Sequence, residues 1–283
     1  MSEHRANLRD VLRFPAGGDL AAFDSGATPS APGGKKTTRR AIATDTGPAL
    51  AALQERLFAR TTVGGRGRVL LVLQGMDTAG KGGVVDHVVG LLGPEWTAVS
   101  AFKQPTDQER KHSFLWRIRR ALPAAGQVGV FDRSHYEDVL VVVVHKEIDR
   151  AQTEKRYRQI NAFESDLAAD GTTIVKCFLH ISFDTQRERL LARLDDPDKH
   201  WKFKEADIDE RQLWPAYQQA YLDALRATST DAAPWFVVPS DHKWYRNWAV
   251  GELLRETMNG LGLEYPQVDL DVDRLRARLA PPN

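Results

Sequence analysis

The chain has 283 residues, of which 42% are hydrophobic, and its 39 basic and 38 acidic side chains leave a formal net charge of +1. This length suits one large α/β domain with additions, or at most two small domains. The balanced charge gives no sign of a chain-wide nucleic-acid or membrane-surface binder. The single cysteine, Cys177, excludes an intrachain disulfide framework and a cysteine-cluster metal site.

The first residues are charged and polar and lack the apolar segment of a signal peptide. The longest apolar run, residues 139–144, is far shorter than a membrane span. We therefore expect a soluble cytoplasmic protein whose partners include neither a membrane nor nucleic acid.

Residues 1–47 are expected to form an irregular arm, because glycines and prolines interrupt this segment repeatedly. A short basic cluster in the arm is either a solvated tail or an anion-binding segment; it consists of Lys35, Lys36, Arg39 and Arg40. In residues 49–59, leucines recur at helical spacing, which predicts a helix packed on the domain.

The apolar residues 69–73 lead directly into a glycine-rich segment, residues 75–83. Gly75, Gly80 and Lys81 fit the phosphate-loop pattern of a glycine, four residues, a glycine and a lysine. In such a loop the backbone N–H groups point into one concavity and the following helix adds its dipole. An alternative is a plain strand-to-helix turn, but strand, full pattern and apolar helix positions occur together here. The predicted phosphate-binding residues of the loop are Gly75, Ala79, Gly80, Lys81, Gly82 and Gly83.

Gly82 stands where a Ser or Thr hydroxyl ordinarily binds magnesium in such loops. The metal therefore needs another protein ligand, and Asp77, inside the loop, is the candidate. We expect Mg²⁺ as the cofactor, with Mn²⁺ as the alternative.

The rest of the chain alternates predicted strands with predicted helices. Strands are expected at residues 69–73, 98–102, 128–131, 173–181 and 235–238, and helices near 81–92, 107–121, 150–169, 183–194, 207–226 and 243–258. This alternation predicts an α/β fold, a mostly parallel sheet covered on both faces, with ligands at the carboxyl ends of the strands. Residues 138–144 have strand-like composition but follow another strand without room for a crossover, so they stay open between strand and buried helix.

Asp132 follows the apolar residues 128–131 at the end of a predicted strand. An acidic residue at that position is the usual partner of a phosphate loop, since the metal lies beside the bound phosphates. Asp77 and Asp132 would then form a pair of oxygen ligands, which suits Mg²⁺. The alternative is that Asp132 caps the next helix. Arg133 comes next and would suit a bidentate contact to phosphate.

Residues 195–204 mix cations, acids and aromatic side chains after a helix that carries Arg187, Arg189 and Arg193. This composition is typical of a lid that closes over anions, although a solvated charged loop is the alternative. A second basic stretch, residues 110–120, is expected to form an amphipathic helix from which one or two side chains reach phosphate.

Six ordered segments together resemble polyphosphate kinase family 2: residues 75–83, 101–106, 112–118, 131–140, 196–203 and 239–247. The resemblance covers nearly the whole chain. It implies a P-loop kinase-like fold similar to thymidylate kinase, with a five-stranded parallel sheet, helices on both faces and a lid near residues 183–210. It also implies that residues 48–283 form one phosphotransferase domain, that magnesium is required, and that the chain assembles as a dimer or tetramer.

Carried over residue by residue, the resemblance implies catalytic roles for Asp77, Lys81, Asp132, Arg133 and Arg193. Residues 134–138 resemble the subgroup that phosphorylates both nucleoside mono- and diphosphates. Gly82 and Asp132, however, resemble the diphosphate-specific subgroup, so the preferred acceptor stays open.

The expected activity is magnesium-dependent transfer of the terminal phosphoryl of inorganic polyphosphate to purine nucleotides, AMP/ADP or GMP/GDP, and the reverse. Beyond the loop, the predicted phosphate-binding residues are Arg133, Lys103, Arg117, Lys199 and Lys202. One alternative is an ATP-dependent kinase of the nucleoside monophosphate type, which would ordinarily keep Ser or Thr at position 82. The other is a non-catalytic nucleotide or polyphosphate sensor, which would not need the metal pair.

Overall fold

The computed structural model describes residues 7–279. The strands are β1 (Arg68–Gln74), β2 (Thr97–Ala101), β3 (Val128–Asp132), β4 (Thr172–His180) and β5 (Trp235–Pro239). The α-helices are α1 (Leu8–Leu12), α2 (Lys35–Ala41), α3 (Gly47–Ala59), α4 (Lys81–His87), α5 (Trp116–Arg120), α6 (Glu137–Val144), α7 (Arg150–Ala169), α8 (Phe183–Leu194), α9 (Ala206–Gln212), α10 (Trp214–Thr228), α11 (Lys243–Asn259) and α12 (Val272–Leu279). Short helical segments include η3 (Arg60–Val63), η4 (Val89–Leu91), η6 (Glu109–Lys111) and η7 (Pro197–Lys202).

The five strands form one parallel sheet in the order β2-β3-β1-β4-β5. The inner strands are buried along nearly their whole length, as their continuous apolar sequences require in a sheet that is covered on both faces. β2, at one edge, is only partly buried. The predicted fold class and all five predicted strands are confirmed.

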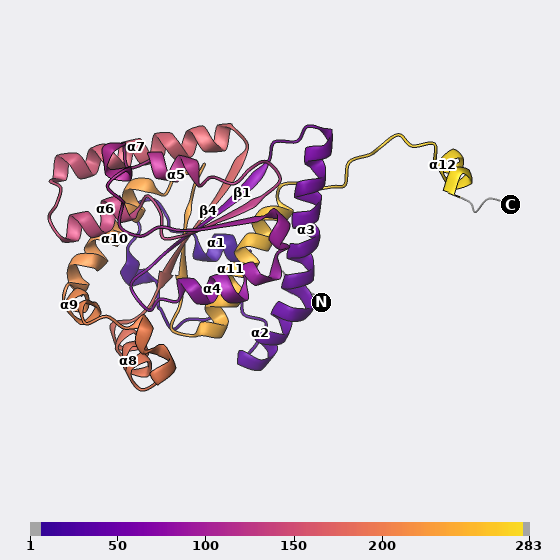
Figure 1. The fold of residues 1–283 in the computed structure, drawn as a ribbon. Helices are drawn as coiled ribbons and strands as arrows, with labels where there is room; N and C mark the ends of the chain where they lie inside the picture. Colours follow the sequence, from indigo (N-terminus) through magenta and orange to yellow (C-terminus); the bar gives the residue numbers. More distant parts are fainter. Residues whose placement is uncertain (1–6, 280–283) are drawn as a thin grey trace.

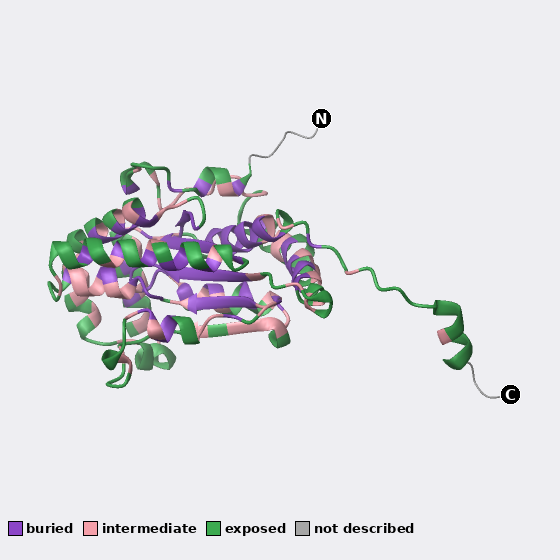
Figure 2. Ribbon diagram, turned by 90° about the horizontal axis from the view of Figure 1, so that it is seen from above, coloured by how far each residue is buried: buried purple, intermediate pink, exposed green. Residues whose placement is uncertain are grey.

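Helices cover both faces of the sheet. Figure 1 shows α6, α7 and α10 on one side of the strands and α3, α4 and α11 on the other. Viewed from above, the strands form a buried layer and the helices turn their exposed residues outward (Figure 2). The core therefore lies on both faces of the sheet, and its loops at the carboxyl edge are left to form a site.

Residues 138–144, which the sequence left open between strand and helix, lie in α6. Val139, Leu140 and Val144 are buried, and the helix packs against α7 and α10. A parallel strand is not possible here, because β3 ends only five residues before α6 and a parallel neighbour would need a longer connection. Tertiary packing therefore makes this segment helical despite its strand-like composition.

Of the predicted irregular arm, the structure describes residues 7–47, and these are more ordered than expected. They contain α1 and α2, and Leu8, Leu12 and Phe14 are buried in the core. The Phe14 N–H donates to the Trp235 carbonyl at 2.8 Å, so the segment lies along the outer edge of β5. Its helices are too short for periodicity to reveal them.

Some predicted helices are divided. The segment at 81–92 is α4 followed by η4, and the segment at 107–121 consists of η6 and α5. The segment at 207–226 is split into α9 and α10 by Leu213, since Pro215 begins a new helix and cannot continue the preceding one.

Two parts project from the body. The segment of α8, η7 and α9 extends at one end, where the lid is predicted, and α12 lies at the end of an extended tail (Figure 1). Across residues 7–279, none of the helices combines the length and the apolar composition needed to cross a membrane.

Candidate active site

The phosphate loop lies where β1 ends, at the carboxyl edge of the sheet. Gln74 is the last residue of β1 and Lys81 is the first of α4. Between them the backbone turns through left-handed conformations, with φ of 61° at Thr78 and 105° at Gly80. A side chain at Gly80 would be strained by this backbone, so the second glycine of the pattern is required here.

Lys81 is buried within the loop, with 9% of its surface exposed. Its Nζ donates to the carbonyl oxygens of Gly75 at 2.7 Å and Met76 at 3.3 Å. Burial, and then the Arg133 guanidinium, lower the pKa of Lys81, whereas the nearby carboxylates of Asp132, Glu137 and Asp77 raise it. The predicted catalytic charges therefore surround one ammonium group.

Two arginines, from helices far from the loop in the sequence, donate hydrogen bonds to backbone carbonyl groups of the phosphate loop. Arg189 of α8 donates from Nη1 to the carbonyl oxygens of Thr78 at 2.8 Å and Ala79 at 3.2 Å. Arg246 of α11 donates from Nη1 to the Ala79 oxygen at 3.1 Å. Burial and the neighbouring Arg189 lower the pKa of Arg246 to about 10. Two guanidinium groups beside one loop create a positive potential that favours a bound anion.

Arg246 is a site residue that sequence reasoning missed. An ideal Cβ on Gly80 would lie 1.7 Å from Arg246 Nη1, and one on Gly83 would lie 2.6 Å from its Nη2. The loop glycines therefore make room for a guanidinium as well as for phosphate. Nothing in the local sequence indicates this role, because the contact exists only after α11 packs against the loop.

Asp132 ends β3 beside the strand that carries the loop. Its Cα pairs with that of Leu73 in β1, two positions before Gly75. α6 begins at Glu137 with Tyr136 as its N-cap, so Asp132 does not cap this helix. Among the described residues, no hydrogen bond engages its carboxylate, which leaves it available to a ligand beside the loop.

Arg133 adopts φ = 64°, a conformation that costs a non-glycine residue about 1–3 kcal/mol. Its N–H donates to the Leu73 carbonyl at 3.1 Å, which fixes the turn. The side chain is exposed and lines the cleft described below. Backbone strain of this kind, held by the surrounding structure, is typical of functional positions.

Glu137 is a second side chain that sequence reasoning did not assign to the site. It lines the same cleft, and burial raises its pKa, whereas Arg133 and Lys81 oppose that rise. Glu137 lies only five residues after Asp132 in the sequence. This short separation could have indicated that Glu137 lies near the same site. Two acids in the first turn, Glu137 and Asp138, also suit the positive end of this helix.

Arg193, near the end of α8, reaches the phosphate loop. Its Nη1 lies 3.0 Å from Asp77 Oδ2 and 3.7 Å from Asp207 Oδ2. Lys199 and Lys202, in η7, lie outside the residues that line the cleft. Lys199 is paired with Asp196, and Lys202 Nζ lies 4.8 Å from the Trp201 ring centroid. Asp77, Lys81 and Arg133 line the cleft, Arg193 joins them through Asp77, and Asp132 ends the neighbouring strand. The two lid lysines make no such contact with the loop.

A cleft of about 750 Å³ opens beside the loop. Its polar wall includes Lys103 and Arg117, and its apolar wall is formed by Leu140, Val141, Val142 and Ile148. The Arg117 guanidinium is already engaged, since it donates to the Lys103 carbonyl at 2.7 Å and pairs with Asp138 at 3.3 Å. A cleft lined by both basic and apolar side chains can hold the phosphates and the flat ring of one ligand.

A divalent metal at this site would need substrate phosphates among its ligands in addition to the protein carboxylates. Within the described residues, no group of three or more His, Cys, Asp and Glu side chains could hold a metal ion. Asp77 and Asp132 are two carboxylates near Lys81. Magnesium binds in this way in phosphotransferases, through one or two carboxylates with phosphates and water as the other ligands. The donor set therefore fits magnesium.

A buried polar network lies behind the turn that carries Arg133. Lys176 of β4 is fully buried, and its Nζ lies 2.6 Å from Glu164 Oε2 and 2.8 Å from the Tyr136 hydroxyl. His135 Nε2 contacts Glu164 Oε1 at 3.2 Å. Burial alone would raise the pKa of Glu164, but Lys176 and His135 outweigh it and lower that pKa. The network anchors the two residues that follow the β3 turn.

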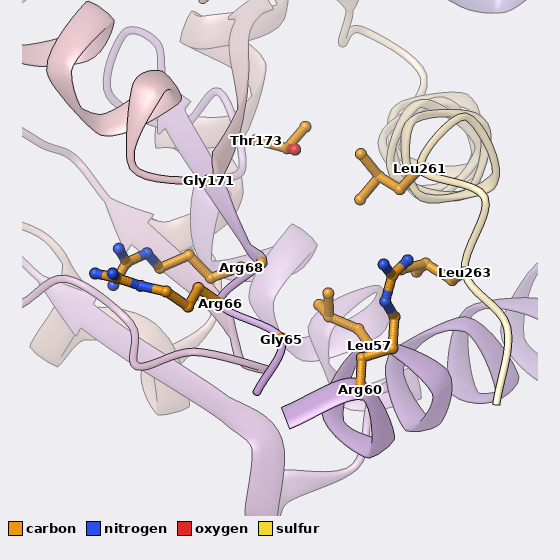
Figure 3. Close-up of a pocket in the computed structure, with 10 residues that line it drawn as sticks. Leu57, Arg60, Gly65, Arg66, Arg68, Gly171, Thr173, Leu261 and Leu263 are labelled. Carbon is orange, nitrogen blue, oxygen red and sulfur yellow. The ribbon is translucent and has the colours of Figure 1, made fainter. Parts of the chain in front are cut away.

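A smaller pocket of about 170 Å³ lies at the opposite, amino-terminal edge of the sheet. Figure 3 shows Leu57, Arg60, Leu261 and Leu263 gathered on one side of it and Arg66 and Arg68 on the other. Arg66 and Arg68 both pair with Asp170. This pocket contains none of the predicted site residues, so the large cleft is the candidate active site.

Comparison with known proteins gives a consistent result. The family model of polyphosphate kinase 2 (PPK2) matches residues 35–263, so the match ends near the point where the chain leaves the globular body. The chain is 45% identical over 257 residues to the AMP/ADP-polyphosphate phosphotransferase of Meiothermus ruber, covering 91% of this chain and 94% of that protein. It is 44% identical over 230 residues to the ADP-polyphosphate phosphotransferase of Rhodopseudomonas palustris, covering 77% and 78%.

The fold is similar as well. The crystal structure of polyphosphate kinase 2 from Arthrobacter aurescens TC1 has a TM-score of 0.94 with this chain, at 50% sequence identity and with 98% of each chain covered. The predicted resemblance to this family is confirmed.

Proposed function

Because the chain belongs to the polyphosphate kinase 2 family, we propose that it transfers the terminal phosphoryl of inorganic polyphosphate to nucleoside mono- or diphosphates, and catalyses the reverse reaction. The proposed acceptors are purine nucleotides, AMP/ADP and GMP/GDP. The names of the two relatives, one acting on AMP/ADP and the other on ADP, support both acceptor classes.

One observation carries the proposal: the buried Lys81 ammonium lies in a glycine-rich loop and is surrounded by charges from three segments of the chain. These are the loop carboxylate of Asp77, Asp132 at the end of β3 with Arg133 directly after it, and Glu137 of α6. Such an arrangement suits phosphoryl transfer, in which the protein mainly positions the reactants and neutralises charge.

In this mechanism the loop N–H groups and Lys81 hold the phosphates that flank the reaction centre. Arg133 and Arg193 neutralise charge on the migrating phosphoryl group. In the structure Arg193 contacts Asp77 at 3.0 Å, so a donor phosphate and Asp77 would compete for the same guanidinium. Asp77 is also placed to orient the acceptor oxygen.

Magnesium, with Mn²⁺ as the alternative, is the proposed cofactor, and Asp77 and Asp132 would hold it. When bound, the ion would neutralise charge on the phosphate oxygens. Asp132 carries no competing hydrogen bond among the described residues, and Asp77 would exchange its contact with Arg193 for the metal.

The acceptor base is proposed to lie against the apolar wall of the cleft, formed by Leu140, Val141 and Val142. The basic residues Lys103 and Arg133 line the same cleft and would contact phosphates. Arg117 is proposed to hold the cleft wall through Asp138, since its guanidinium is already engaged. Lys199 and Lys202 could contact only the outer part of a long polyphosphate donor.

Residues 48–283 are proposed as one phosphotransferase domain, and residues 183–210 as its lid. We further propose that the protein works in the cytoplasm and assembles as a homo-oligomer, a dimer or tetramer. The lid proposal rests on the projecting position of α8, η7 and α9 beside the loop (Figure 1).

The test is to incubate the pure protein with AMP or ADP, a magnesium salt and polyphosphate, without ATP, and to measure nucleotide products. Formation of ADP or ATP that depends on polyphosphate is the expected result. Products that appear only when ATP replaces polyphosphate would indicate an ATP-dependent kinase. Binding of nucleotide and polyphosphate without any product would indicate a sensor.

Salt dependence provides a second test. Binding of polyphosphate should weaken much more than binding of the acceptor as salt rises, because the donor displaces counterions from several basic groups. Equal salt dependence of the two dissociation constants would contradict a basic track for the donor.

A further inference from the structure

The last helix of the described chain lies away from the body that precedes it. After Leu263 the chain extends through residues 264–271 and then forms α12 (Figures 1 and 2). No residue of α12 is buried. Eight extended residues reach about 26 Å, which is enough to carry the helix onto a neighbouring molecule.

α12 has a face that ordinarily requires a partner. Val272, Leu275 and Leu279 recur at helical spacing and form an apolar stripe, and Leu279 is 86% exposed. The helix has only eight residues, and isolated helices shorter than about 12–15 residues are marginal in water. Packing of the apolar stripe is therefore the expected source of its stability.

The exit point of the tail is fixed to α3. Leu261 and Leu263 share a pocket with Leu57 of α3 (Figure 3), and the Arg56 guanidinium lies 5.7 Å from the Tyr265 ring centroid. The tail then turns away from its own body. Whatever α12 contacts must therefore approach from the α3 side of the molecule.

That side of the molecule offers a matching surface. Phe58 and Val63, at the end of α3 and in η3, are 37% and 60% exposed, and Phe58 stacks on Trp96 at 4.9 Å. The exposed acids Glu55 and Glu95 lie close to these residues in the sequence. Of the three arginines of α12, Arg274 and Arg276 lie near Asp271 and Asp273 at 3.7 and 3.9 Å. Arg278 has no ion pair among the described residues, so it is the cation that can meet an acid of this surface.

We propose that α12 packs on the α3 side of a second copy of this chain, so that two copies exchange their C-terminal arms about a two-fold axis. Both arms leave beside α3 and both dock beside α3 of the partner, as a self-complementary interface requires. This inference names the contact behind the homo-oligomer proposed above. It does not depend on the catalytic proposal, because α12 is remote from the cleft.

The experiment compares the full-length chain with two full-length variants by sedimentation equilibrium. In the first, Leu275→Asp and Leu279→Asp are combined to remove the apolar stripe. In the second, Ala277→Asp is combined with Arg274→Ala, which makes the same change of two charge units on the opposite face of α12, as a matched control. We expect the parent and the control to have at least twice the mass of the 31.7 kDa chain. Association of the stripe variant should be weaker by about 100-fold or more, as for loss of buried interface anchors.

Cross-linking identifies the partner. A photoreactive p-benzoylphenylalanine replaces Leu275 in a chain with normal isotopes, which is mixed with a heavy-isotope chain. Cross-links between light and heavy peptides, with the α3–η3 segment as acceptor, are expected. The proposal is overturned if the parent is monomeric, if the stripe variant associates as the control does, or if cross-links join only residues within one chain. It is also overturned if anionic phospholipid vesicles bind the parent through α12 without any increase in mass in their absence.

Discussion

Two glycines of the phosphate loop, two positions apart, should respond in opposite ways to the same substitution. Gly80 has φ = 105°, and a Cβ there would lie 1.7 Å from Arg246 Nη1. Gly82 lies in the first turn of α4 and has nothing within 4 Å of an added Cβ. Gly80→Ala is therefore expected to impair the loop, and Gly82→Ala is its matched control.

The size of the effect follows from two separate costs. Forcing a side chain into the Gly80 backbone costs about 1–3 kcal/mol, which should appear as a lower free energy of unfolding. The Arg246 guanidinium must also move, although it is only 4% exposed and bonded to Ala79 and Asn247. Loss of one charged hydrogen bond costs about 1.5–3 kcal/mol. If polyphosphate binds only to the parental loop conformation, restoring that conformation on binding would weaken affinity by about 10- to 150-fold.

Gly82→Ala keeps the backbone N–H group and adds a residue that favours the helix. Its free energy of unfolding should rise by about 0.5–1 kcal/mol, and its affinity for polyphosphate should match that of the parent. Urea unfolding and titration calorimetry with polyphosphate measure the two quantities. In an Arg246→Met background, Gly80→Ala should cost much less affinity, because the displaced group is already absent.

The reasoning is refuted if Gly80→Ala changes stability by less than about 0.5 kcal/mol, the usual range of neutral substitutions, and binds polyphosphate as the parent does. It is also refuted if Gly82→Ala is as damaging as Gly80→Ala. Equal losses would mean that the loop tolerates no added atom, whatever its backbone conformation and neighbours.

Three further predictions concern the metal ligands, the lid and the buried ion pair. Asp77→Asn and Asp132→Asn should each lower kcat by about 100-fold or more and raise the magnesium concentration required, with an unchanged circular dichroism spectrum; near-normal kcat for Asp132→Asn would exclude it as a charged ligand. Arg193→Ala should lower kcat more than it weakens nucleotide binding, with partial recovery in Arg193→Lys, whereas parental rates in both variants would assign the lid cation elsewhere. Lys176→Met should lower the free energy of unfolding by about 3–5 kcal/mol, because it leaves the Glu164 carboxylate unpaired, and adding Glu164→Gln should restore most of the loss. Since Lys176 and His135 lower the pKa of Glu164 below its ordinary 4.5, this contribution is present above pH 4.5 and should be lost in urea titrations as pH falls below it.

The site residues that could be predicted from the sequence are those that belong to short sequence patterns. The loop pattern identified Lys81, and the strand that ends in an acid identified Asp132, because parallel strands bring their carboxyl ends to one edge. The same logic placed all five strands. Each of these inferences depends on a residue and its immediate neighbours in the chain.

The role of Arg246 could not be predicted in this way, because its contact with Ala79 joins positions 167 residues apart. The α6 helix was undecidable for a related reason, because its valines suit a strand and only packing against α10 makes them helical. The short helix α1 was missed because five residues show too little periodicity. These features depend on tertiary contacts rather than on local pattern.

The contacts of Arg189 restrict how the projecting segment of α8, η7 and α9 can swing. Its guanidinium is bonded to carbonyl groups of Thr78 and Ala79 on one side and of Ser240 and Asp241 on the other. Arg193 lies only about 6 Å further along the same helix axis, at 1.5 Å per residue. A rigid swing of the whole helix would break all four bonds at once. If the lid opens as proposed, Arg189 would act as its pivot and the part free to move would be η7, just beyond it. α9 is held to the fixed part of α8, because Arg211 donates to the Phe183 carbonyl at 2.7 Å and to Gln186 Oε1 at 2.9 Å.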